Sequence, residues 1–227
     1  MGIHGVRPDG AGPFPVVVFF HHGPGLDEGS KQTMARIADC GYYVVTHDRY
    51  HRAEAWYTMK SRTDEEMKKM FGLVLGTTEA QVAEDLDALL AWLPSDPAAR
   101  HGAMACIGYC IGARSSLCTM RDRGESFRAA AGLHPSFCTT EDEDSPHRAV
   151  PSYTGSLYIG FGSADTMQPA SANTALIHAT NALAKGEAET HDGADHGFAV
   201  FGPAYHEAAA DRSYDRVKAM FDRELKP

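Results

Sequence analysis

The pentapeptide Gly108-Tyr109-Cys110-Ile111-Gly112 decides the fold, because it lies between an apolar run at residues 103–107 and a helical pattern at residues 113–120. Small residues on both sides of a nucleophile, between a strand and a helix, are typical of a sharp turn known as a nucleophile elbow. Glycine is favoured at both flanks because strand and helix pass too close for side chains. The turn places Cys110 at a helix N-terminus, where the dipole favours the reactive thiolate.

Apolar runs and amphipathic stretches alternate on both sides of this turn. The pattern predicts strands at residues 16–20, 42–45, 103–107, 128–133, 157–161 and 187–191, and helices at residues 30–40, 63–74, 78–93, 113–120, 169–185 and 204–225. This alternation predicts an α/β fold with a mostly parallel sheet and helices on both faces. With no linker or repeat in it, the whole chain, residues 1–227, is expected to form a single domain.

Composition excludes several classes of function. A net charge of -9 gives no support for a nucleic-acid partner. No apolar run approaches the roughly 20 residues that span a bilayer, and the N-terminus lacks a secretory pattern, so we expect a cytoplasmic protein with no membrane partner. Cysteine spacing shows no CxxC pair, which favours a reducing compartment, and histidine spacing shows no metal motif, so neither a metal nor another cofactor is expected. The five cysteines are Cys40, Cys106, Cys110, Cys118 and Cys138.

Partners for Cys110 follow two later strands. Asp165 comes after the strand at residues 157–161, and His196 lies in a small-residue loop after the last strand. Nucleophile, acid and histidine thus occur in the chain order of α/β-hydrolases. We expect His196 to accept the thiol proton and Asp165 to orient the imidazole, so that Cys110 attacks an ester carbonyl and forms a thioester that water cleaves.

An oxyanion formed in this reaction needs two fixed donors. One is expected to be the backbone N–H of Ile111, directly after the nucleophile. The other is expected in the turn after the first apolar strand, with the N–H of Gly23 as the candidate.

Three segments together resemble the dienelactone hydrolase (carboxymethylenebutenolidase) family: residues 108–112, Gly-Tyr-Cys-Ile-Gly; residues 162–165, Gly-Ser-Ala-Asp; and residues 194–198, Ala-Asp-His-Gly-Phe. The resemblance runs from Pro15 onward. It implies an α/β-hydrolase fold without a large lid domain, a catalytic triad of Cys110, Asp165 and His196, no metal, and a monomer that acts on a small-molecule ester or lactone.

Two positions depart from the family pattern. His22 stands where members carry a glutamate that helps to activate the cysteine, and Val200 stands where an arginine binds the dienelactone carboxylate. The substrate is therefore expected to be a different ester or lactone. Candidate substrate contacts are His22, Arg49, Arg52, Trp56 and Phe198.

Alternatives remain at the site and for the function. His191 competes with His196 but lies on the strand, and Asp165 competes with Asp192 and Asp195, over which its strand-end position favours it. The same triad would also serve a thioesterase or an acyltransferase. A non-catalytic ligand-binding relative is a third possibility, because the residues at positions 22 and 200 are altered.

Overall fold

Seven strands form one sheet in the order β1-β3-β2-β4-β5-β6-β7 in the computed structural model, which describes residues 1–226. Every neighbouring pair is parallel except β1 with β3, which confirms the predicted mostly parallel sheet. The strands are β1 (Ile3–Val6), β2 (Val16–Phe20), β3 (Tyr43–His47), β4 (Met104–Tyr109), β5 (Phe127–Leu133), β6 (Ser156–Gly162) and β7 (Gly186–His191).

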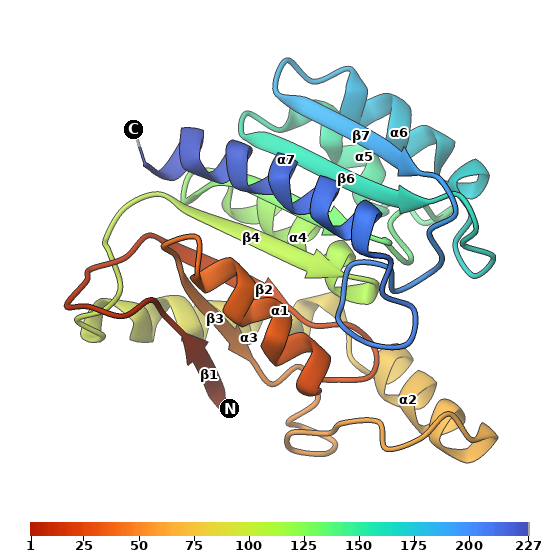
Figure 1. Ribbon diagram of the computed structural model, residues 1–227, viewed down its shortest axis with the longest axis horizontal. Coiled ribbons are helices and arrows are strands. Elements are labelled where there is room, and N and C mark those ends of the chain that lie inside the picture. Colours follow the sequence, from red (N-terminus) through yellow and green to blue (C-terminus); the bar gives the residue numbers. More distant parts are fainter. Residues whose placement is uncertain (227) are drawn as a thin grey trace.

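Helices cover both faces of the sheet (Figure 1). α1 (Glu28–Ala38) and α7 (Glu207–Leu225) pack on one face, and α3 (Glu79–Trp92), α4 (Ile111–Arg123) and α6 (Thr174–Asn181) pack on the other. α2 (Asp64–Gly76) projects from this body beyond the carboxyl ends of the strands. The short elements are α5 (Pro146–Ala149) and the 3-10 turns η1 (Leu93–Ser95), η2 (Val150–Ser152) and η3 (Ala170–Asn173).

The central strands are buried on both faces, which explains why their sequences are apolar throughout rather than alternating. In β2 all five residues are buried. Val17 and Phe19 belong to the core under α1 and α7, whereas Val16, Val18 and Phe20 belong to the core under α3, α4 and α6.

Three local features differ from the sequence-based expectations. Strand β1 was not expected, because its four residues form a strand only through antiparallel pairing with β3, which lies far along the chain. Helix α1 starts before Ser30, since the Asp27 carboxylate caps it by accepting a 2.8 Å hydrogen bond from the Ser30 N–H. The expected helix at 169–185 is divided into η3 and α6, and Gly186 starts β7 instead of ending the helix.

The strand order reverses next to the cysteine turn. From β2 the chain first continues to β3 on one side and later returns to β4 on the other side, so β2 and β4 are neighbours with Phe20 opposite Gly108. Ligands of open α/β sheets bind beyond the carboxyl ends of the strands at such a switch point. The loops after β2, β4, β5, β6 and β7 therefore meet there. Among residues 1–226 no helix has the length and apolar character needed to cross a membrane.

Candidate active site

Cys110 occupies a strained turn between β4 and α4. Its φ of 54° and ψ of -118° lie in a backbone region that residues other than glycine rarely adopt. A Cβ atom at Gly108 would overlap the carbonyl of Gly112, and one at Gly112 would overlap the carbonyl of Phe20. Glycine is thus required on both sides, as expected of a nucleophile elbow, and the thiol is presented at the start of α4.

Asp165 and His196 form a hydrogen-bonded pair beside this turn. Nδ1 of His196 donates to Oδ2 of Asp165 at 2.7 Å, while Oδ1 accepts from the N–H groups of Met167 and Gln168 at 2.9 and 2.8 Å. Burial raises the pKa of Asp165, but the bond from His196 and these amides outweigh it, so the pKa is lowered. The aspartate is held ionised, and the imidazole is fixed with Nδ1 protonated.

His196 and Cys110 perturb one another. Burial lowers the pKa of His196, but the interactions with Asp165 and Cys110 raise it to about 10. Burial raises the pKa of Cys110, yet the interactions with His196 and with Ser136 lower it to about 7. Nε2 of His196 has no formed hydrogen bond, and Oγ of Ser136 lies 3.3 Å from Sγ. Both shifts favour the thiolate at Cys110 and the protonated imidazole at His196.

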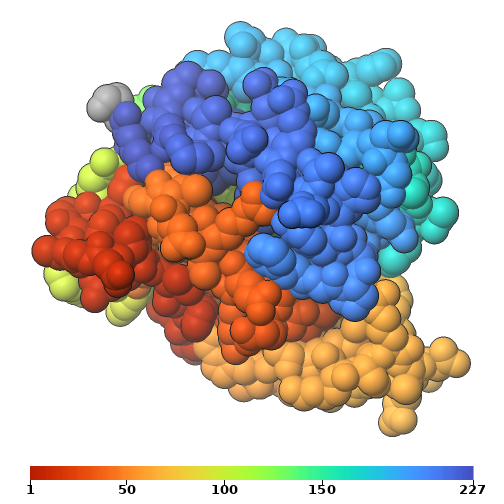
Figure 2. Space-filling view, in the orientation of Figure 1, coloured from red at the N-terminus to blue at the C-terminus, as the bar shows by residue number. Residues whose placement is uncertain are grey.

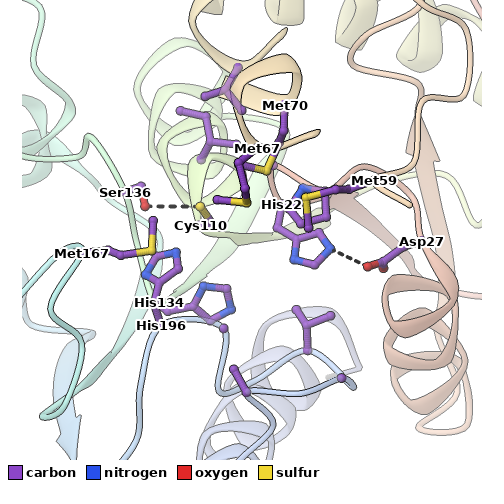
Figure 3. A pocket seen from close by; sticks show the side chains of 18 of the residues that line it. His22, Asp27, Met59, Met67, Met70, Cys110, His134, Ser136, Met167 and His196 are labelled. Atoms are coloured by element: carbon purple, nitrogen blue, oxygen red, sulfur yellow. Dashed lines mark hydrogen bonds and ion pairs between the residues drawn. The ribbon is translucent and has the colours of Figure 1, made fainter. Parts of the chain in front are cut away.

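The two histidines after β2 have separate roles. His21 is buried, donates from Nδ1 to the carbonyl of His22 at 2.8 Å and accepts at Nε2 from the N–H of Arg49 at 3.4 Å. It fixes the turn, and burial lowers its pKa to about 3. His22 instead lines the pocket in front of Cys110, and its Nε2 lies 3.2 Å from the carboxylate of Asp27 (Figure 3).

The two candidate oxyanion donors are brought to the same pocket wall. Ile111 is the first residue of α4, where backbone N–H groups have no acceptor within the helix. Gly23 lies in the turn after β2, and the Tyr50 hydroxyl donates to its carbonyl at 3.0 Å, which fixes the peptide.

A pocket of about 580 Å³ opens in front of the thiol. Figure 3 shows the sulfur atoms of Met59, Met67, Met70 and Met167 around it. Two of the walls are α2 and the segment after β7, which adjoin in the space-filling view as the amber and the blue surface (Figure 2). This methionine lining could not be predicted from the sequence, because no local pattern connects residues that three separate segments supply.

Four expected substrate contacts lie outside the pocket wall. The Arg49 guanidinium donates hydrogen bonds to Ser115 Oγ at 2.7 Å and to Glu79 Oε1 at 3.1 Å. The Arg52 guanidinium donates to the carboxylates of Asp85 and Glu84.

The two aromatic candidates also lie outside the wall. Trp56 is 41% exposed and lies against Gly2. Phe198 is fully buried, with its ring 5.7 Å from that of His134. Long-range partners, which the sequence does not reveal, redirect these side chains: Arg49, Arg52, Trp56 and Phe198.

His134 is a site residue that the sequence analysis did not single out. It follows β5 with a φ of 40°, lines the pocket, and places its ring 5.0 Å from that of His196. It is 1% exposed, and neither ring nitrogen has a hydrogen-bond partner. Burial lowers its pKa well below the usual value, so the ring is neutral. The available signal was a histidine directly after a buried strand.

Competing residues for the histidine and acid roles are engaged elsewhere. His191 lies outside the pocket wall, and its Nε2 is 2.9 Å from Ser213 Oγ. Asp192 accepts from Ser163, and Asp195 accepts from the N–H of His196. Within residues 1–226 no group of three or more histidine, cysteine or acidic side chains is arranged to hold a metal ion.

Comparison with known proteins places the chain in one family. The sequence pattern described as "Dienelactone hydrolase family" matches residues 2–225. A Synechocystis protein named "Putative carboxymethylenebutenolidase" is 29% identical over 231 aligned positions, which cover 97% of this chain and 90% of that protein. A protein of the same name from Escherichia coli K12 is 25% identical, covering 92% of this chain and 77% of that protein.

A solved structure shares the fold. The crystal structure titled "Putative Dienelactone Hydrolase" from Klebsiella pneumoniae superimposes with a TM-score of 0.81 at 22% identity, over 97% of this chain and 92% of that one. The agreement extends over the whole sheet and its helices, so the α/β-hydrolase fold without a large additional domain is confirmed.

Proposed function

The chain belongs to the dienelactone hydrolase family of hydrolases, and from this premise we propose that it cleaves carboxylic esters or lactones with Cys110 as the nucleophile. Asp165 and His196 complete the triad in this proposal. The observation that carries it is the 2.7 Å bond from Nδ1 of His196 to Asp165, which leaves Nε2 unpartnered beside a thiol of lowered pKa.

The first half-reaction transfers the acyl group to sulfur. The Cys110 thiolate attacks the carbonyl carbon, a C–S bond forms, and the negative charge moves to the carbonyl oxygen, where the N–H groups of Ile111 and Gly23 bind it. As the tetrahedral intermediate collapses the ester C–O bond breaks. The His196 imidazolium gives its Nε2 proton to the departing alkoxide, so the alcohol leaves neutral.

The second half-reaction returns the enzyme to its starting state. Neutral His196 takes a proton from water at Nε2, and the resulting hydroxide attacks the thioester carbonyl. The C–S bond breaks, the acid is released, and sulfur leaves as the thiolate beside the imidazolium. Asp165 stabilises the imidazolium at both stages without being protonated itself.

Hydrolysis of a short-chain aryl ester tests the proposal. Wild type should release the phenol at a rate that the Cys110→Ala and His196→Ala variants do not reach. Ser116→Ala is a matched control, because this buried serine lies on α4 outside the pocket wall. Equal rates in wild type and Cys110→Ala across several esters and lactones would contradict the proposal.

A further inference from the structure

The pocket in front of Cys110 contains little that could bind an anion. Val200, which is 4% exposed, forms part of the wall where the family pattern has an arginine. The only lysine and arginine side chains in the wall, within the described residues, are Lys60 and Arg62, and both are exposed. Arg49 is turned away and bound to Glu79.

Two carboxylates lie near the thiol, each paired with a histidine. Asp165 lies behind His196, and Asp27 lies in the pocket wall beside His22. His134 is neutral, because burial lowers its pKa well below the usual value. The His196 imidazolium is already paired with Asp165. A substrate carboxylate buried in this pocket would therefore lose its hydration without gaining an unpaired cation, which is unfavourable.

The remaining wall suits an apolar group. Met67, Met70 and Val74 of α2 lie on one side of the thiol, and Met70 and Val74 form a cluster with Ile111. Met59 and Met167 come from the loops before α2 and after β6. Methionine side chains are unbranched and flexible, so they adapt to apolar ligands of varied shape.

We propose that this site accepts esters or thioesters whose acyl part is an uncharged, elongated apolar chain, in place of a carboxylate-bearing lactone. The inference rests on the proposed function, because it assigns the substrate class of the same thiol. The acyl chain lies along Met67, Met70 and Val74 after Cys110 has attacked the carbonyl. The pocket volume falls in the range of about 300–1,000 Å³ typical of sites that enclose ligands of that size.

A pair of esters that differ only in charge tests the inference on the wild-type protein. 4-Nitrophenyl hexanoate and the mono-4-nitrophenyl ester of adipic acid carry acyl chains of equal carbon number, and only the second ends in a carboxylate. We expect kcat/KM for the hexanoate to exceed that for the adipate ester by about 30-fold or more, because the apolar wall of Met67, Met70 and Val74 offers the chain-end carboxylate no partner.

Chain length gives a second measurement. From acetate to hexanoate, kcat/KM should rise by about three- to fivefold for each added methylene until the pocket is filled. Met70→Ala should flatten this rise. Leu75→Ala is the matched control, since Leu75 lies on the same helix, is 71% exposed and is not in the wall.

The outcomes separate this inference from the function on which it rests. Equal or faster cleavage of the adipate ester, or no dependence on chain length, overturns the substrate class while hydrolysis itself stands. Failure to cleave any ester overturns the proposed function and the inference with it. Val200→Arg should narrow the gap between the two esters by raising kcat/KM for the charged one.

Discussion

Cys106 and Cys110 lie four residues apart, yet their surroundings make them opposite kinds of thiol. Cys106 lies inside β4, is fully buried, and points its sulfur toward the Ser116 carbonyl at 3.7 Å. Burial raises its pKa to about 12. Cys110 lies at the end of the same strand, and its pKa is lowered to about 7.

Burial does not distinguish the two thiols, because it raises the pKa of both. The difference comes from His196 and Ser136, which stabilise the thiolate at Cys110. At Cys106 only the contact with Ser116 lowers the pKa, and burial outweighs it. The positive φ of Cys110 turns its side chain out of the strand and into the pocket that His196 also lines. The lowered pKa at this position therefore depends on the loops after β5 and β7 as much as on the cysteine.

The largest expected effect is the loss of the Cys110 sulfur. Cys110→Ala should reduce ester hydrolysis by about 10⁴-fold, because the atom that would form the covalent intermediate is removed. Cys106→Ala should leave kcat/KM nearly unchanged and lower the free energy of unfolding by about 1–2 kcal/mol, since it removes a small buried group. Steady-state kinetics and urea unfolding measure the two effects. Loss of ester hydrolysis in Cys106→Ala would contradict the contrast between the two thiols.

Removal of the orienting carboxylate should have the second-largest effect. Asp165→Asn keeps the shape but no longer fixes the His196 tautomer or stabilises its cation, so kcat/KM should fall by about 10²–10⁴-fold. Asp192→Asn is the control, because this nearby carboxylate bonds only to Ser163 and lies outside the pocket wall. Equal losses in both variants would show that Asp165 has no special role.

Iodoacetamide should alkylate Cys110 about tenfold or more faster than the other cysteines at neutral pH. Deprotonation of Cys110 is centred at about 7, so its rate should rise with pH through that value and then level off. Cys40 is the reference, because it is partly exposed and burial raises its pKa. Peptide mass spectrometry follows each site.

The pKa shifts of Cys110 and His196 predict how ester hydrolysis should depend on pH. Above pH about 7 the thiolate is present, and above pH about 10 His196 loses the proton that the leaving group needs. We expect kcat/KM to rise through the first value and fall through the second. In His196→Ala the alkylation midpoint of Cys110 should move above that of an ordinary thiol, and an unchanged midpoint would show that His196 does not act on the sulfur.

The smallest expected effect concerns Asp27, which caps α1 and bonds to His22. Asp27→Ala should lower the free energy of unfolding by about 1 kcal/mol through loss of the cap. Asp9→Ala, at an exposed aspartate, should leave the free energy of unfolding unchanged.

The stability that Asp27 contributes should also depend on pH. The interaction with His22 and the Ser30 N–H outweighs burial and lowers the pKa of Asp27 to about 2. Its stabilisation is therefore complete above the ordinary aspartate pKa and is lost as pH falls toward about 2. Urea unfolding at neutral and acid pH measures both, and equal stability of wild type and Asp27→Ala at neutral pH would contradict the cap.

Sequence predicted the features that are local in the chain. The elbow could be predicted because Gly108 and Gly112 are required by close backbone approach, and the central strands because both of their faces are buried. Strand β1 could not, since its place depends on pairing with β3. Arg49 was misplaced because Glu79, from a helix far along the chain, binds it.

The proposed triad followed from strand-end position, but its surroundings did not. Ser136 and His134 face the pocket only because β5 lies between β4 and β6 in the sheet. The methionine lining depends on α2 projecting over the thiol, an arrangement that an amphipathic pattern alone does not specify. The positions of the triad candidates were therefore more predictable than the shape and charge of the cavity around them.

The most direct test of the account is the location of the covalent intermediate. Wild-type protein quenched in acid during turnover of an aryl ester should carry one added acyl group by intact-mass measurement. Trypsin cleavage after Arg100 and Arg114 yields a peptide that contains both Cys106 and Cys110. Fragmentation should place the acyl group on Cys110; an acyl group on any other residue, or none during steady turnover, would contradict the account.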